Sequence, residues 1–249
     1  MTSPQISRDL IDQPLSLIFV NCILVLVGSF AIYLLCHWLE ADAMELEWSE
    51  LWMPEASLSG AIGSVWFIFA WAAGLSLLAC LANARRPRAH EPGEIFWAGI
   101  WISAMAGFFE ELAWRGFNFL SAMAIVTLVN WLTFGLSKWL YTELLGPVAN
   151  WATLGYLEPQ LLGGSWVIGA AILSANADFR NGHRYLGLFG YVNSWFIGMV
   201  MFYLVFHYGL LAAIVAHILY DLCIFTVRAI GASWQPQPTP ISELYRRTY

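Results

Sequence analysis

Charged residues are scarce in this sequence: they make up 11% of its 249 residues, whereas soluble domains carry about 25%. Hydrophobic residues account for 59% of the chain. This balance predicts an integral membrane protein, with the lipid bilayer as its surroundings. The sequence also has no basic patch of the kind that binds nucleic acid, so we expect no nucleic-acid partner.

Several patterns typical of metal sites and nucleophilic enzymes are missing. The four cysteines lie in apolar stretches without a CxxC pattern, which argues against a thiolate metal site or a disulfide framework. The HExxH pattern is absent, and no serine is paired with a histidine in an evident motif. The cysteines are Cys22, Cys36, Cys80 and Cys223.

Long apolar runs predict the fold, because a spanning helix needs about 20 apolar residues. The predicted fold is all-α: a polytopic transmembrane helical bundle with about 7–8 membrane segments. No internal repeat or second domain is evident, so one bundle is expected. The predicted segments are residues 15–39, 61–84, 95–120, 121–146, 161–177, 185–208 and 210–230.

The chain divides into four predicted parts. Residues 1–14 form a polar N-terminal segment, and residues 15–93 hold two spans joined by an acidic loop. Residues 94–232 form the helical core, and residues 233–249 form a soluble tail.

Charges at the ends of the second span predict its orientation. Arg85, Arg86 and Arg88 follow it, whereas the loop before it carries acidic residues and no Lys or Arg. The positive-inside rule therefore places these arginines in the cytoplasm and the acidic loop outside. We expect a multi-pass protein of the inner or plasma membrane, if the cell is prokaryotic. Arg8 near one end of the chain, and Arg246 and Arg247 near the other, indicate that both ends are also cytoplasmic. An odd number of segments, seven, cannot leave both ends on the same side, so one segment is split, re-entrant or miscounted.

Glu110, Glu111 and Arg115 interrupt an otherwise apolar run. Each charged residue at the centre of a membrane helix costs about 2.5–3.5 kcal/mol, so such residues face a protein interior or a hydrated cavity and mark a functional site. On a helix Glu111 and Arg115 are i,i+4 neighbours, while Glu110 points about 100° away from Glu111. Glu110 is then left to face a cavity as a general base. The alternative is a buried ion network that only fixes helix packing.

Two further motifs place histidines in or beside apolar runs. Phe179 and His183 form an FxxxH motif, although His183 could equally lie at a helix end without any chemical role. His217 and Asp221 are spaced i,i+4 and share one helix face. They could instead form a hydrogen bond that only joins helices.

The remaining isolated polar residues receive no chemistry. The sequence Phe134 to Lys138 imitates the FxxxH motif, but it has lysine where histidine is required. The other unassigned residues are His37, His90, Asp178 and His207.

The three motifs EExxxR, FxxxH and HxxxD, in this order on three hydrophobic segments, together resemble the CPBP family. These are the type II CAAX-prenyl-endopeptidase-like proteins, also described as glutamic-type intramembrane proteases. The resemblance covers about residues 94–226. It implies that Glu110 and His183 bind and activate a water molecule, and that Glu111 and Arg115 orient and tune that pair.

The resemblance also assigns the third motif and the apolar member of the second. It implies that His217 and Asp221 stabilise the oxyanion and that Phe179 contacts substrate. Because an ionised aspartate cannot donate a hydrogen bond, Asp221 either is protonated or orients His217, which then donates. We favour the second. No cofactor is expected. Zn²⁺ is possible but not favoured. Its acceptable ligands would be Glu110, His183, His217 and Asp221.

The predicted function is that of an intramembrane endopeptidase, a hydrolase. It would cleave a membrane-anchored, hydrophobic or lipidated peptide or protein substrate with glutamate-activated water. One alternative is a catalytically silent relative that binds peptides as a membrane chaperone or immunity factor. Another is a transporter or channel whose buried carboxylates relay protons. No oligomeric state is predicted.

Overall fold

The computed structural model describes residues 15–38 and 57–237, and within them every regular element is a helix. Helix α2 (Leu15–Trp38) covers the first predicted span. Helices α4 (Leu58–Ser64) and α5 (Trp66–Asn83) cover the second, with a break at Val65. The polar N-terminal segment, the acidic loop and most of the soluble tail lie outside the described residues.

A single helix of 41 residues, Pro92–Leu132, carries the first charged motif. It consists of α6 (Pro92–Glu111), a π-helical segment η1 (Leu112–Asn118) and α7 (Phe119–Leu132). The sequence predicted two spans that meet at residue 120, and this boundary is wrong. No turn residue interrupts the chain there. The helix ends instead before Phe134 and Gly135, which both adopt positive φ angles.

Short elements follow this long helix. They are α8 (Leu136–Leu140), the π-helical η2 (Tyr141–Leu145), α9 (Gly146–Ala152) and the π-helical η3 (Pro159–Gly163). The predicted span 121–146 is therefore interrupted and is not a single helix.

Three longer helices complete the described chain. Helix α10 (Trp166–Gly182) begins at Ser165, whose side chain accepts a hydrogen bond from the backbone N–H of Val167. It is followed by a 3₁₀ turn, η4 (Arg184–Leu186), and by α11 (Gly187–Tyr208) and α12 (Leu210–Ser233).

Four described helices are long and apolar enough to cross a membrane. The protein is thus all-helical with four candidate spans in this part of the chain, and the larger number of 7–8 segments stays a prediction. The four are Trp66–Asn83, Pro92–Leu132, Arg184–Tyr208 and Leu210–Ser233.

The chain forms two compact units, and helices α6 and α12 each continue from one unit into the other. Of the described residues, the first unit comprises 15–38, 57–63 and 108–214, and the second comprises 64–107 and 215–237. The predicted division into four parts follows composition, whereas these units follow packing.

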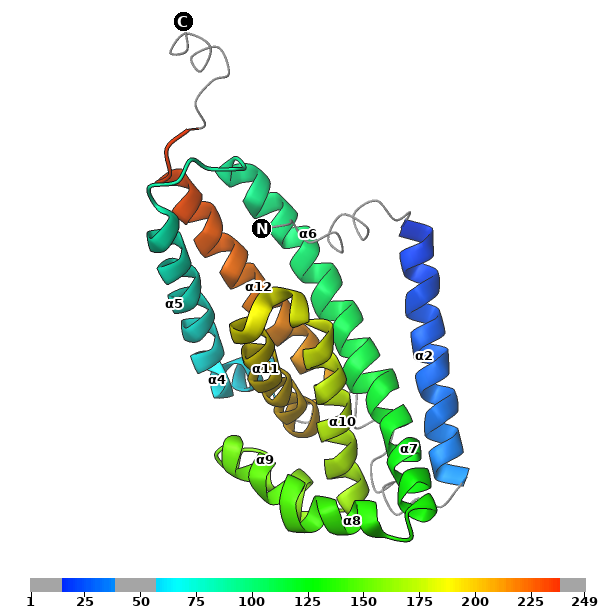
Figure 1. The fold of residues 1–249 in the computed structure, drawn as a ribbon. Helices are drawn as coiled ribbons and strands as arrows, with labels where there is room; N and C mark the ends of the chain where they lie inside the picture. The colour runs from blue at the N-terminus through cyan, green and yellow to red at the C-terminus, as the bar shows by residue number, and fades with distance from the viewer. Residues whose placement is uncertain (1–14, 39–56, 238–249) are drawn as a thin grey trace, which may run out of the picture. The chain divides into compact units, whose positions relative to one another are not determined.

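The core of the first unit forms where α10 packs against α7 and α11 (Figure 1). Ala171, Ile172 and Ala175 of α10 are fully buried in it. The aromatic rings of Phe119 and Phe202 meet edge to face at 5.6 Å between centroids. Helix α2 packs against η1 and α7. These contacts hold α7, α10 and α11 in fixed relation, which positions the polar residues that they carry.

In the second unit, two glycines let α12 approach its neighbours closely. A Cβ atom on Gly99 of α6 would overlap Phe225, and one on Gly231 of α12 would overlap the side chain of Cys80 on α5. The Cys80 thiol donates to the carbonyl of Val227 at 3.7 Å. Small residues at helix contacts are typical of membrane bundles, in which close van der Waals packing drives association.

We expect leucine at Gly99 or Gly231 to destabilise the protein, because overpacking of a close contact costs about 1–3 kcal/mol. The matched control is Gly74→Leu on α5, where a Cβ atom would meet nothing within 4 Å. Thermal unfolding in detergent, followed by tryptophan fluorescence, measures the effect. Equal unfolding midpoints for Gly231→Leu and Gly74→Leu would contradict the described packing.

Candidate active site

The predicted ion pair between Glu111 and Arg115 is present and is sealed from solvent. Arg115 Nη1 lies 3.2 Å from Glu111 Oε1, and neither side chain is exposed. A buried ion pair is costly to desolvate, so both groups need further partners of good geometry. The surroundings of Arg115 provide them.

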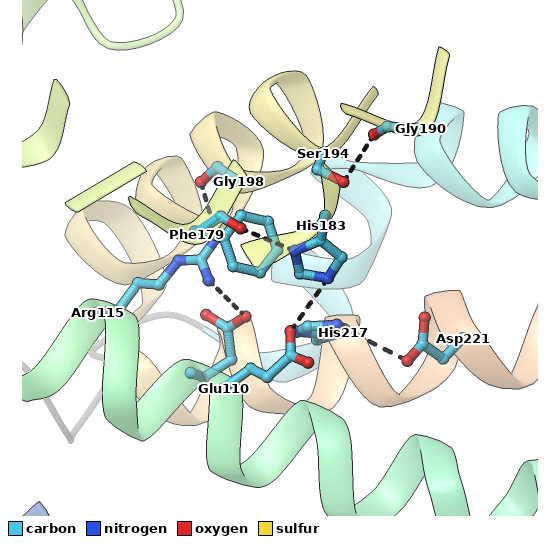
Figure 2. A network of polar contacts seen from close by, with 10 residues as sticks. Glu110, Arg115, Phe179, His183, Gly190, Ser194, Gly198, His217 and Asp221 are labelled. Atoms are coloured by element: carbon cyan, nitrogen blue, oxygen red, sulfur yellow. Dashed lines mark hydrogen bonds and ion pairs between the residues drawn. The ribbon is translucent and has the colours of Figure 1, made fainter. Parts of the chain in front are cut away.

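Two other helices complete the seat of Arg115. Its Nη2 donates to the carbonyl of Gly198 on α11 at 3.2 Å. Its guanidinium carbon lies 4.2 Å from the centre of the Phe179 ring on α10 and 5.4 Å from that of Phe202 on α11. Cation–π contact of this kind stabilises a desolvated arginine. Arg115 therefore ties η1 to α10 and α11 (Figure 2).

The first motif lies at a change of helix type. Glu110 and Glu111 end α6, and the π-helical segment η1, which contains Arg115, begins at Leu112. Short π-helical segments within α-helices occur frequently at functional sites. The α-helix assumed from the sequence therefore changes to a π-helix at Leu112, although the predicted i,i+4 pair of Glu111 and Arg115 still forms. Nothing in the sequence indicated the π segment.

Phe179 connects Arg115 to His183. The ring centroids of Phe179 and His183 lie 4.5 Å apart, and the carbonyl oxygen of Phe179 is 2.8 Å from His183 Nδ1. A carbonyl only accepts hydrogen bonds, so Nδ1 carries the proton and Nε2 is the atom left for chemistry. Phe179 is 3% exposed. Its observed contacts are those of a positioning residue, and substrate contact by Phe179 stays a prediction.

Glu110 and His183, far apart in the sequence, face each other in the first unit (Figure 2). Glu110 Oε2 lies 3.7 Å from His183 Nε2, and the two side chains are 30% and 16% exposed. This separation exceeds the 2.7–3.2 Å range of a direct N–H···O hydrogen bond. The pair therefore combines partly exposed side chains with a separation too long for a direct hydrogen bond.

Sequence reasoning missed Asn176 and Gly198. Asn176 is fully buried, and its Nδ2 donates to the carbonyl of Trp195 on α11 at 2.9 Å. A Cβ atom on Gly198 would overlap Asn176 Oδ1 and would lie 2.9 Å from Phe179 and 3.1 Å from Arg115. An asparagine inside an apolar run was the available signal, but only tertiary contacts show why position 198 is glycine.

The third motif lies in the second unit. His217 Nε2 is 3.8 Å from Asp221 Oδ2, as the i,i+4 spacing predicted, and His217 is buried. Glu110 and His183 belong to the first unit. That His217 and Asp221 stabilise the oxyanion of a reaction at Glu110 and His183 stays a prediction.

Two of the polar residues without assigned chemistry, His207 and Asp178, have structural contacts. His207 Nδ1 pairs with the carbonyl of Tyr203 at 2.9 Å, and its ring stacks on Tyr203. Asp178 accepts a hydrogen bond from Asn118 at 3.2 Å. Within the described residues, no three His, Cys, Asp or Glu side chains form a group that could hold a metal ion.

Comparison with known proteins adds no relative: no family model, curated protein or solved structure matches this chain. The resemblance to the CPBP family therefore rests on the three motifs alone.

Replacing one member of the buried ion pair should lower the free energy of unfolding far more than replacing both members. We expect Arg115→Met to lower the free energy of unfolding by about 3–5 kcal/mol, because the Glu111 charge stays buried. The double variant Glu111→Leu/Arg115→Met should recover much of this loss. Thermal unfolding of the two single variants and the double variant measures the coupling. Simple addition of the two single effects would show that the pair is not coupled.

Alanine at Gly198 should be destabilising, although alanine normally stabilises a helix by about 0.5–1 kcal/mol relative to glycine. The reason is the overlap of its Cβ atom with Asn176. Gly63→Ala on α4, where a Cβ atom would meet nothing within 4 Å, is the control. Comparison of the two unfolding midpoints tests the seat of Arg115, and a higher midpoint for Gly198→Ala than for the wild type would refute it.

Proposed function

We propose that this protein is an intramembrane endopeptidase of the glutamic type. In this proposal, water activated between Glu110 and His183 hydrolyses a peptide bond of a membrane-associated or lipidated substrate. The observation that carries the proposal is the 3.7 Å approach of these two side chains. Further support comes from their setting, a chain with four candidate membrane-spanning helices in its described part.

The position of the ring proton of His183, on Nδ1, supports a role in binding water. With Nδ1–H donated to the Phe179 carbonyl, Nε2 of the neutral imidazole can only accept. The Glu110 carboxylate is also an acceptor. A water molecule can donate one hydrogen bond to each, which leaves an oxygen lone pair directed at a substrate carbonyl. Glu110 then takes a proton as the water attacks, and it returns that proton to the leaving amine.

The buried pair supports this chemistry indirectly. Glu111 neutralises Arg115, so Glu110 does not have to serve as the partner of that guanidinium. Arg115 holds Phe179 in place, and Phe179 in turn orients His183. In the proposal these three are positioning residues. They keep the carboxylate and imidazole at a fixed separation, as general-base catalysis requires.

His217 and Asp221 receive the role of oxyanion stabilisation in this proposal. Asp221 Oδ2 lies 3.8 Å from Nε2 of His217, so an ionised Asp221 would orient an imidazolium that is protonated on both nitrogens, whose Nδ1–H can then donate to the oxyanion. This agrees with the preference for an orienting aspartate over a donating one.

Comparison of protein termini tests the proposal without a known substrate. Membranes from cells that express the wild type, Glu110→Gln or His183→Gln are analysed by mass spectrometry of new N- and C-terminal peptides. We expect termini in or beside hydrophobic or lipidated segments that depend on the wild-type chain. Loss of the general base should lower their rate of formation about 10²–10⁴-fold.

Two variants serve as matched controls. Glu143→Gln and His207→Gln change the same residue types at exposed positions outside the candidate site, and both should retain the products. Unfolding midpoints confirm that each variant folds. Products that persist unchanged in the folded Glu110→Gln variant would reject the peptidase and leave a peptide-binding protein.

A further inference from the structure

The sequence contains a short repeat, contrary to our expectation of none. The pattern Asn-Trp-x-Thr-Φ-Gly, in which Φ is a large apolar residue, occurs at residues 130–135 as NWLTFG and at residues 150–155 as NWATLG. The first copy ends α7 and the second ends α9. The proposed function uses neither copy.

Both copies fold into the same turn. The apolar residues Phe134 and Leu154 have φ angles of 52° and 54°, and the following glycines, Gly135 and Gly155, have 89° and 77°. Two consecutive residues with positive φ are rare, and a large side chain in the first position is unfavourable. In each copy the glycine N–H donates at 2.9 Å to the carbonyl of the asparagine five residues earlier. This bond is that of a Schellman helix end.

The threonines fix the two turns in the same way. Thr133 Oγ1 donates to the carbonyl of Val129 at 2.8 Å, and Thr153 Oγ1 donates to that of Ala149 at 2.9 Å. The common sequence therefore encodes a common backbone, and the same side chains occupy the same positions on both turns.

Each turn presents two large apolar side chains to the outside. Phe134 is 99% exposed and Leu154 is 84% exposed. The tryptophans Trp131 and Trp151 are 73% and 79% exposed. Large exposed apolar groups gathered in this way mark a contact with a partner or a membrane. Tryptophan is in particular enriched where a protein meets the membrane–water interface.

The inner side of the segment between the turns is fixed to the first unit through Tyr141. This side chain is 3% exposed, and its hydroxyl donates to the carbonyl of Leu161 at 2.7 Å. A Cβ atom on Gly169 of α10 would overlap the Tyr141 hydroxyl. Burial raises the pKa of this phenol, so it stays protonated and keeps its role as donor. The segment therefore has one side packed on η3 and α10 and another side exposed.

The backbone of the turns determines their depth. Non-helical backbone such as these turns is tolerated at membrane depth only where protein or water surrounds it. The first turn directly follows the candidate span Pro92–Leu132, and we place it where that helix leaves the hydrocarbon. The helices between the turns run crosswise to α7 and α10 (Figure 1). Residues 136–152 would extend about 25 Å as a helix, less than the hydrocarbon thickness of about 30 Å.

We propose that residues 130–155, two turns joined by a short helical stretch, form an interfacial segment. This segment lies in the headgroup region of one leaflet and inserts its exposed tryptophans and the apolar tips Phe134 and Leu154 toward the acyl chains. This proposal does not depend on peptidase activity. It does relate the candidate site to the bilayer. Helix α10 begins at Trp166, near the interfacial segment, and Phe179 lies 13 residues further along it, or about 20 Å of helix.

Depth measurements on the full-length chain test the placement of the interfacial segment in the headgroup region. Single cysteines replace Phe134 or Leu154 in a cysteine-free background and carry a nitrobenzoxadiazole label. The chain is reconstituted with uniform orientation in sealed phosphatidylcholine–phosphatidylglycerol vesicles. Two positions calibrate the scale: Leu128→Cys on α7, which is 55% exposed within a candidate span, and His90→Cys, which is exposed in the connection between α5 and α6.

We expect the labels at positions 134 and 154 to be quenched several-fold more by lipids brominated near the headgroup than by lipids brominated near the chain ends. External dithionite should reduce both from the same side of the vesicle. The proposal is overturned if both labels behave like that at His90 or like that at Leu128. It is equally overturned if dithionite reaches the two labels from opposite sides, since residues 136–152 would then cross the membrane.

A second measurement does not require removal of the native cysteines. Benzoylphenylalanine at position 134 of the otherwise unchanged chain should form photo-crosslinks to lipid. Crosslinks to another protein instead of lipid would reassign this surface to a protein partner and overturn the proposal.

Discussion

A guanidinium and a carboxylate shielded from water, those of Arg115 and Glu111, fix the place where η1, α10 and α11 meet. An isolated charge could not remain there, because its desolvation would exceed any packing gain. Arg115 is held there by the ion pair, by its hydrogen bond to the carbonyl of Gly198 and by the ring of Phe179. The rest of the candidate site depends on this arrangement, since Phe179 also holds the ring of His183.

The two carboxylates of the first motif thus differ in environment, although they are neighbours in sequence. Glu111 is fully buried against Arg115, whereas the Glu110 side chain is 30% exposed and faces His183. The first stabilises the architecture, and the second is partly exposed and carries the chemistry that we propose. This division gives a physical reason for adjacent glutamates inside an apolar helix. It also separates the expected effects of substitution: loss of stability at position 111 and loss of chemistry at position 110.

Local features of this structure could be predicted from the sequence, and features that depend on packing could not. The pairing of Glu111 with Arg115 follows from helical spacing alone, as does that of His217 with Asp221. The approach of His183 to Glu110 was expected only through the resemblance to a known family, because no local rule relates them. The span boundary placed at residue 120 was wrong because hydrophobicity does not mark helix ends, whereas the turn residues near position 134 do.

The most direct test of this account is the distance between the Glu110 carboxyl carbon and His183 Nε2 in lipid bilayers. Rotational-echo double-resonance NMR on a chain with ¹³C-glutamate and ¹⁵N-histidine measures it, with His183→Gln as the blank. We predict dephasing of the Glu110 carboxyl signal that corresponds to a carboxylate beside the imidazole, with Oε2 3.7 Å from Nε2, and that disappears in the blank. Equal dephasing in the wild type and in His183→Gln would contradict it.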